Sequence, residues 1–205
     1  MKRRAARWQG GRGGAVRAFA LALLLALAAV APASPDSSAA NAQSSTANFE
    51  GVATCAGSTC HGRSEGNGAV VRQDEIATWQ APSSASGAHS RAYSVLASRR
   101  GRQIAQTLGL GAATSAPACL GCHATYVPQS RRGARFHTSD GVGCESCHGA
   151  AEGWLQVHYE KAASHASNVR AGLVPLEDPQ VRAKICLDCH YGSTDTGQFV
   201  THSMM

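Results

Sequence analysis

The sequence predicts a mainly α protein with extensive loops, and two observations lead to that prediction. Several short segments have helical features, whereas no convincing segment alternates apolar and polar residues with the period of two that marks a strand. The chain also holds 22 glycines and only 5% aromatic residues, so its side chains alone cannot build a large core. We therefore expect short helices joined by loops, with little conventional hydrophobic core.

The first 33 residues have the features of a secretory signal peptide. Met1 to Arg17 carries one lysine and five arginines with no acid, and Ala18 to Ala31 is a 14-residue apolar run, too short to be taken first as a membrane span. Cleavage fits after Ala33 or after Ala42, and an uncleaved membrane anchor is the alternative. Cleavage would leave 13 basic and 13 acidic residues, so the near-neutral mature chain gives no evidence for nucleic-acid binding. We expect an exported, periplasmic protein with no stable membrane span after cleavage.

The rest of the chain divides into a linker and one domain. Residues 34–48 are small and polar, which predicts a flexible linker, and residues 49–205 form the domain. Four segments of that domain are predicted to be helical: 73–79, 89–100 with a continuation to 108, 150–170, and a helix that Asp178-Pro179 opens. The third of these helices would place Trp154, His158, Ala162 and His165 on one face.

All eight cysteines fall into four pairs, and a histidine follows each pair directly. The four motifs are Cys55-AGST-Cys60-His61, Cys119-LG-Cys122-His123, Cys144-ES-Cys147-His148 and Cys186-LD-Cys189-His190. Three of them are the C-x-x-C-H signature of c-type haem attachment. The first has a spacer two residues longer, in which Gly57 and Ser58 make a bulge easy to form.

This spacing suits covalent haem binding. Two cysteines three residues apart on a helical turn point the same way, so both sulfurs can add to the vinyl groups on one porphyrin edge, and the next residue can offer a proximal imidazole to the iron. Four disulfides or two zinc sites are the alternatives, but neither requires a histidine after each second cysteine, and the chain has only nine histidines. We therefore predict four haem c groups, attached at the eight cysteines and forming a compact tetrahaem core, with iron bound by His61, His123, His148 and His190. Because covalent attachment follows export, the signal peptide agrees with this prediction.

The remaining histidines are candidates for the distal iron positions. Five of them are available for four irons: His89, His137, His158, His165 and His202. Methionine is a poor candidate, because beyond Met1 only Met204 and Met205 occur, at the very end of the chain. Bis-histidine ligation lacks the thioether that raises the potential, so we expect low-potential haems.

The third motif resembles a known family. Gly141-Val-Gly-Cys144-Glu-Ser-Cys147-His148-Gly149 is similar to the third haem segment of the tetrahaem cytochrome c-554 family, the electron carriers associated with hydroxylamine oxidation in nitrifiers. The likeness covers most of Phe49 to His202, including Gly51-Val52, Trp79 and the segment from His89 to Ala92. It implies stacked haem pairs, three bis-histidine irons and a five-coordinate iron at the second site.

The resemblance also implies a distal ligand map. His158 would lie opposite His61, His89 opposite His190, and His202 opposite His148. His165 is the substitute for His202, because the tail after His190 is shorter than is usual in the family. The second iron, on His123, would be open or closed by His137.

Two functions follow from these expectations. An electron carrier would pass single electrons from an upstream oxidoreductase to a downstream acceptor, either alone or as a subunit of a larger redox complex. An enzyme would use an open iron at His123 on a small nitrogen oxide or a peroxide, with nearby candidate groups Tyr126, Arg131, Arg132, Arg135 and His137. We favour the carrier, because only the possible open position argues for catalysis.

Overall fold

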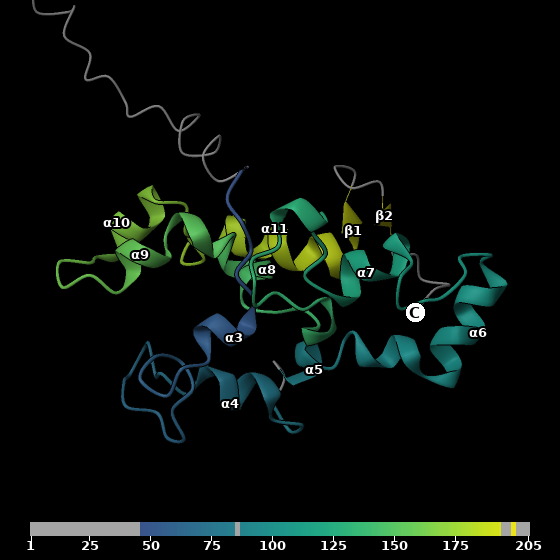
Figure 1. The fold of residues 1–205 in the computed structure, drawn as a ribbon, viewed down its shortest axis with the longest axis horizontal. Coiled ribbons are helices and arrows are strands. Elements are labelled where there is room, and N and C mark those ends of the chain that lie inside the picture. The colour runs from purple at the N-terminus through teal and green to yellow at the C-terminus, as the bar shows by residue number, and fades with distance from the viewer. Residues whose placement is uncertain (1–45, 85–86, 194–197, 200–205) are drawn as a thin grey trace, which may run out of the picture. The chain divides into compact units, whose positions relative to one another are not determined.

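The computed structural model describes residues 46–84, 87–193 and 198–199 (Figure 1). The predicted signal peptide, most of the predicted linker and His202 lie outside the described residues. Ala47 is buried and the backbone of Asn48 donates to Glu152 over 2.6 Å, so ordered contacts begin before the domain boundary that the sequence indicates. None of the helices described is long and apolar enough to cross a membrane.

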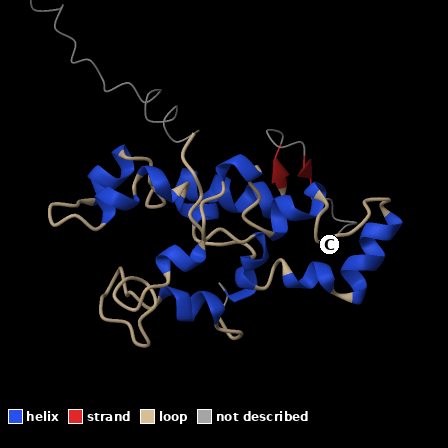
Figure 2. Cartoon of the chain, in the orientation of Figure 1, coloured by secondary structure: helices blue, strands red, loops and turns tan. Residues whose placement is uncertain are grey.

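Short helices and loops make up most of the described chain, which confirms the expected mainly α class (Figure 2). In chain order the elements are α3 (Val52–Cys55), α4 (Glu75–Gln80), α5 (Gly87–Ser90), η1 (Ser94–Ala97), α6 (Arg99–Thr107), α7 (Pro117–His123), η2 (Gln129–Arg131), η3 (Thr138–Asp140), α8 (Glu145–His148), η4 (Ala151–Gly153), α9 (Leu155–His158), α10 (His165–Arg170), α11 (Pro179–His190), β1 (Gly192–Ser193) and β2 (Gln198–Phe199). The two strands pair antiparallel over two residues each.

Two of the predicted helices agree with the structure. α4 begins at Glu75, two residues later than expected, and ends at Gln80. α11 begins at Pro179 as the caps predicted, because the Asp178 side chain accepts a hydrogen bond from the Gln180 backbone over 2.8 Å.

The other two predicted helices are divided in the structure. Ser98 is extended and accepts from the Gly101 backbone, so it starts α6 as a separate helix after α5 and η1. Ser164 does the same for α10, in a capping box with Ser167, and separates it from α9. His158 and His165 therefore lie on different helices, and the prediction that they share one helical face is wrong.

The buried apolar core is small, as the composition predicted. Ten apolar residues are buried in the described chain, and seven of them are alanines. No large side chain among the described residues is fully buried. The main cluster joins α6 to α7 and contains Leu96, Ala105, Ala113, Leu120 and Ala124. Side-chain burial on this scale contributes little to stability for a chain of this length.

Candidate haem-binding site

The four cysteine–histidine motifs lie at or near helix ends. α7, α8 and α11 end at His123, His148 and His190, the histidines of the second, third and fourth motifs. The first motif begins at Cys55, the last residue of α3, and its longer spacer forms a turn. The backbone of His61 returns to donate to the Cys55 carbonyl over 3.2 Å, so the extra residues form a loop and the ends of the motif stay together.

Two pairs of histidine rings lie close together, one with nearly parallel planes (17° between His61 and His158) and one edge-on (73° between His89 and His190). The ring centres of His61 and His158 are 6.0 Å apart, and those of His89 and His190 are 6.2 Å apart. An imidazole nitrogen binds a transition metal at about 2 Å and the ring centre lies about 1 Å behind it, so two imidazoles on opposite sides of one metal have centres about 6 Å apart. Both pairs therefore have the separation that one shared iron requires.

Hydrogen bonds fix which nitrogen of two motif histidines is free. His61 Nδ1 lies 2.9 Å from Glu75 Oε2, and His123 Nδ1 lies 2.9 Å from the Ala92 carbonyl. A carboxylate or carbonyl on Nδ1 holds the proton there and leaves Nε2 to bind a metal. The two histidines are thus oriented as iron ligands would be.

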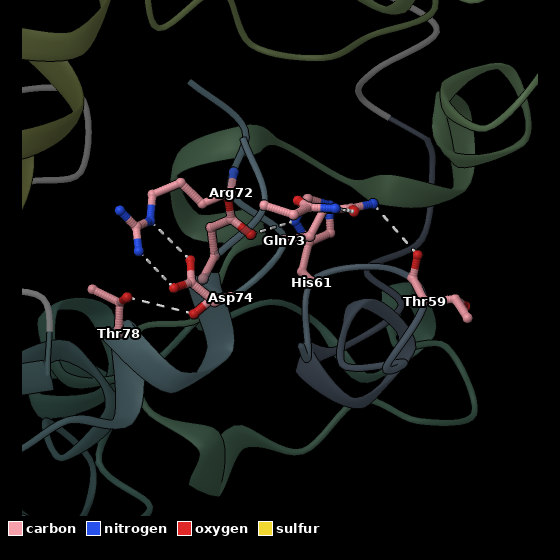
Figure 3. A network of polar contacts seen from close by, with 8 residues as sticks. Thr59, His61, Arg72, Gln73, Asp74 and Thr78 are labelled. Atoms are coloured by element: carbon pink, nitrogen blue, oxygen red, sulfur yellow. Dashed lines mark hydrogen bonds and ion pairs between the residues drawn. The ribbon is translucent and has the colours of Figure 1, made fainter. Parts of the chain in front are cut away.

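The segment before α4 supports His61 (Figure 3). The Arg72 backbone donates to Glu75 over 2.7 Å, and the Arg72 guanidinium donates to both oxygens of Asp74. The guanidinium holds the pKa of the Asp74 carboxyl below its usual range. Gln73 donates to the carbonyl of Thr59 over 3.4 Å, which attaches the first motif's loop to the same segment.

His158 lies in a partly buried site built by α9 and α10. The ring of Trp154 meets it edge-on at 5.5 Å, and Asn168 Nδ2 lies 3.3 Å from His158 Nδ1. Burial, and then the nearby His61, lower the pKa of His158 and favour the neutral imidazole that binds metals. Two buried polar atoms here lack a hydrogen-bond partner, Trp154 Nε1 and Asn168 Oδ1. Such atoms commonly indicate a missing group, and a porphyrin propionate could accept from the indole.

Cysteines of different motifs lie next to one another. A hydrogen bond joins the thiols of Cys55 and Cys144 and raises the pKa of Cys55 while lowering that of Cys144. Burial, and then Cys122, raise the pKa of Cys189 to about 11. Burial, and then Cys186, also raise the pKa of Cys147. The first motif is therefore adjacent to the third and the fourth to the second, and the third motif lies within electrostatic range of the fourth.

A buried carboxylate joins the first and third motifs. Glu145 is 5% exposed, and its two oxygens accept from the backbone N–H groups of Glu50, Gly51 and Ala151 over 2.9, 2.7 and 2.7 Å. Gly51 has a φ of +85°, and a side chain there would collide with the Arg135 carbonyl, so the position requires glycine. Glu145 thus clamps the entry of α3 onto α8.

An open cavity of about 470 Å³ lies beside the first motif. Its lining includes Val52 and Ala56 on and after α3, Ile76 and Trp79 of α4, and His137 with Asp140. Burial raises the pKa of Asp140. The size and the mixed lining suit a flat apolar group with polar edges.

Several predicted site residues lie elsewhere. His137 lines this cavity with residues of α3 and α4, and the structure does not pair its ring with that of His123. His165 is exposed and its Nε2 lies 2.8 Å from Glu177 Oε1. The guanidiniums of Arg131 and Arg132 donate to the carbonyls of Ala47 and Val127.

Two further candidates also lie outside the site, and two residues of the site were not predicted from the sequence. Tyr126 and Arg135 are exposed on the loop after α7. Glu145 and Asn168 were missed, because only the folded backbone brings their partners to them. Of the two, only Glu145 carried a signal, which was its place between two motif cysteines.

Comparison with known proteins gives one match. Residues 54–149 match the family model described as cytochrome c554 and c-prime. The matched segment contains the first three cysteine–histidine motifs and ends before the fourth. No curated protein and no solved structure matches the chain.

Proposed function

We propose that this chain, whose residues 54–149 match the cytochrome c554 and c-prime family model, is an exported tetrahaem cytochrome that passes single electrons between redox partner proteins. The match supports a c-type cytochrome electron carrier with covalently bound haem. The finer proposal, four haems in the periplasm, depends on the four motifs and on the signal peptide that the sequence predicts. The observation that carries it is the two pairs of histidine rings, whose centres lie 6.0 and 6.2 Å apart, the spacing of two ligands on one iron.

The proposed ligand map follows from these pairs. The eight motif cysteines would hold the porphyrins by thioether bonds. His61 with His158, and His190 with His89, would bind the first and fourth irons. His148 would bind the third iron, with His202 of the tail as its second ligand. His123 would bind the second iron through Nε2, since its Nδ1 is held by the Ala92 carbonyl.

The small core supports porphyrin binding independently of the motifs. No large side chain of the described residues is fully buried, and a chain of this size needs apolar surface from another source. When bound, haem supplies reversible one-electron chemistry that no side chain of this protein offers. The protein's contribution is to hold the imidazoles in place and to set the dielectric and charge around them.

The adjacency of the motifs supports stacked haem pairs. Because the attachment cysteines of motifs one and three are in contact, as are those of motifs four and two, the porphyrin edges that they hold would be close. The electrostatic influence of Cys186 on Cys147 indicates that motifs three and four are also near each other, which would join the two pairs. Electrons could then cross the protein in the order first, third, fourth, second.

The alternative function is chemistry at the second haem. It is favoured by one observation, that among the described residues no histidine ring faces His123. The acid–base groups that an enzyme would require are not gathered there, because Arg131 and Arg132 bind backbone carbonyls and Tyr126 and Arg135 are exposed on the loop. We therefore retain the electron carrier.

An electron paramagnetic resonance spectrum of the oxidised, haem-loaded mature protein tests both functions. We expect mass spectrometry to give four haems, and the spectrum to give low-spin signals from the bis-histidine irons. A high-spin signal from about one haem in four that shifts with nitric oxide or cyanide would support chemistry at His123. Fewer than four haems would contradict the tetrahaem proposal.

Asn168 offers a separate test of the His158 assignment. If His158 binds iron through Nε2, its Nδ1 carries a proton, and the Asn168 amide must turn so that its unpaired Oδ1 accepts that proton. We expect Asn168→Leu to raise the midpoint potential of one haem, because the imidazolate character of its ligand is lost. Asn168→Asp, which keeps the acceptor, should lower that potential. A potentiometric titration measures both, with Ser167→Ala, which alters only the helix cap, as the control. Equal shifts in Asn168→Leu and Ser167→Ala would contradict the assignment.

A further inference from the structure

The charges of this chain are strongly segregated along the sequence. Residues 76–139 contain seven arginines and no acidic residue. The rest of the chain after residue 33 contains six basic and 13 acidic residues. The positive segment includes α5, α6 and the second cysteine–histidine motif, so the near-neutral total conceals a basic stretch of sequence that contains that motif.

α6 presents the densest part of this positive charge. Arg99, Arg100 and Arg102 are all exposed, and none of them forms an ion pair with a described acidic residue. α6 is fixed to the fold through Ala105, which is fully buried in a cluster with Leu120 of α7 and with Ala124, the residue after α7. The arginines of α6 therefore lie on a helix that packs directly against α7, which carries the second motif.

Exposed apolar residues accompany these arginines. Val95, Ile104 and Leu108 are 48%, 45% and 55% exposed. Arginine beside apolar side chains is the composition that protein–protein interfaces favour, whereas a site for a small anion needs donors that converge on one point. We call the set of Arg99, Arg100, Arg102, Val95, Ile104 and Leu108 the α6 face.

We propose that the α6 face is the docking surface for an acidic redox partner protein. The inference rests on the proposed electron-carrier function and adds the partner's chemistry and its place of contact. Carboxylates on the partner would pair with the three guanidiniums, and attraction over this region would steer the partner toward the second haem. The apolar residues would then hold the partner at short range.

Stopped-flow reduction of the haem-loaded full chain tests this proposal. The probe is a reduced, acidic plant-type ferredoxin, measured over a series of NaCl concentrations. We expect the triple variant Arg99→Gln/Arg100→Gln/Arg102→Gln to lose about tenfold or more in second-order rate constant at low salt, and to lose most of its salt dependence. The matched control is Arg63→Gln/Lys161→Gln/Arg170→Gln, which removes the same charge from exposed positions outside the basic region. It should change the rate less than twofold.

A second donor separates docking of a protein from steering of small anions. Leu108→Ser should slow reduction by ferredoxin severalfold and leave reduction by dithionite unchanged, because only a protein would bury Leu108. Equal losses in the two triple variants, or equal responses to the two donors, would overturn the docking proposal. Haem content and midpoint potentials are measured on every variant. A chain that takes electrons from neither donor would contradict the carrier function itself.

Discussion

Replacing Glu145 with glutamine is expected to cost about 3 kcal/mol or more of the free energy of unfolding. The carboxylate accepts from three backbone N–H groups in a buried site, and each hydrogen bond to a charged group contributes about 1.5–3 kcal/mol. An amide at this position keeps one acceptor oxygen and turns an NH₂ group toward a backbone donor. Since domains of this size are stable by only about 5–15 kcal/mol, the loss is a large fraction of the total.

Chemical denaturation followed by circular dichroism measures this effect. Glu152→Gln is the matched control, because Glu152 also accepts from a backbone N–H, that of Asn48, but at an exposed position. We expect the control to cost about 1 kcal/mol or less. Equal midpoints for the two variants would show that Glu145 is not the clamp between the first and third motifs.

His158→Ala should convert one low-spin haem to high-spin. The ring of His158 faces that of His61 at 6.0 Å, so its removal would leave the first iron with one protein ligand. The optical and paramagnetic resonance spectra should show about one further haem in four as high-spin, and added imidazole should restore the low-spin form. The midpoint potential of that haem should rise.

His165→Ala is the control for this variant, because His165 is exposed and bound to Glu177 rather than to a histidine pair. Its spectrum should be that of the unaltered protein. A change in spin state with His165→Ala and none with His158→Ala would reverse the ligand assignment and remove the observation on which the tetrahaem proposal mainly depends.

The cysteine–histidine motifs and the fold class could be predicted from the sequence because their information is local. The same holds for α11, whose cap and proline are adjacent in the chain. The divisions at Ser98 and Ser164 were missed, although both serines are strong N-cap residues, because an apolar period that continued through them outweighed a single polar position.

Contacts between site residues that are distant in the sequence could be established only from the structure. Resemblance suggested His61 with His158 and His89 with His190, but spacing along the chain does not measure the distance between their rings. Glu145 and Asn168 were not predicted, because their partners Gly51 and His158 lie 94 and 10 residues away and meet them only in the folded chain. The resemblance left the second iron, on His123, either open or closed by His137, and in the structure His137 lines the cavity beside α3 and α4.

The alanine-rich core has a consequence for how cells handle this protein. Ten buried apolar residues, seven of them alanines, cannot hold the described helices together, so on the proposed function a chain that lacks one haem loses a large part of its interior rather than a single contact. Locally unfolded segments are the preferred substrates of proteases. Attachment at all four motifs is then a condition for survival after export, and periplasmic proteolysis would remove incompletely loaded chains before they met a redox partner.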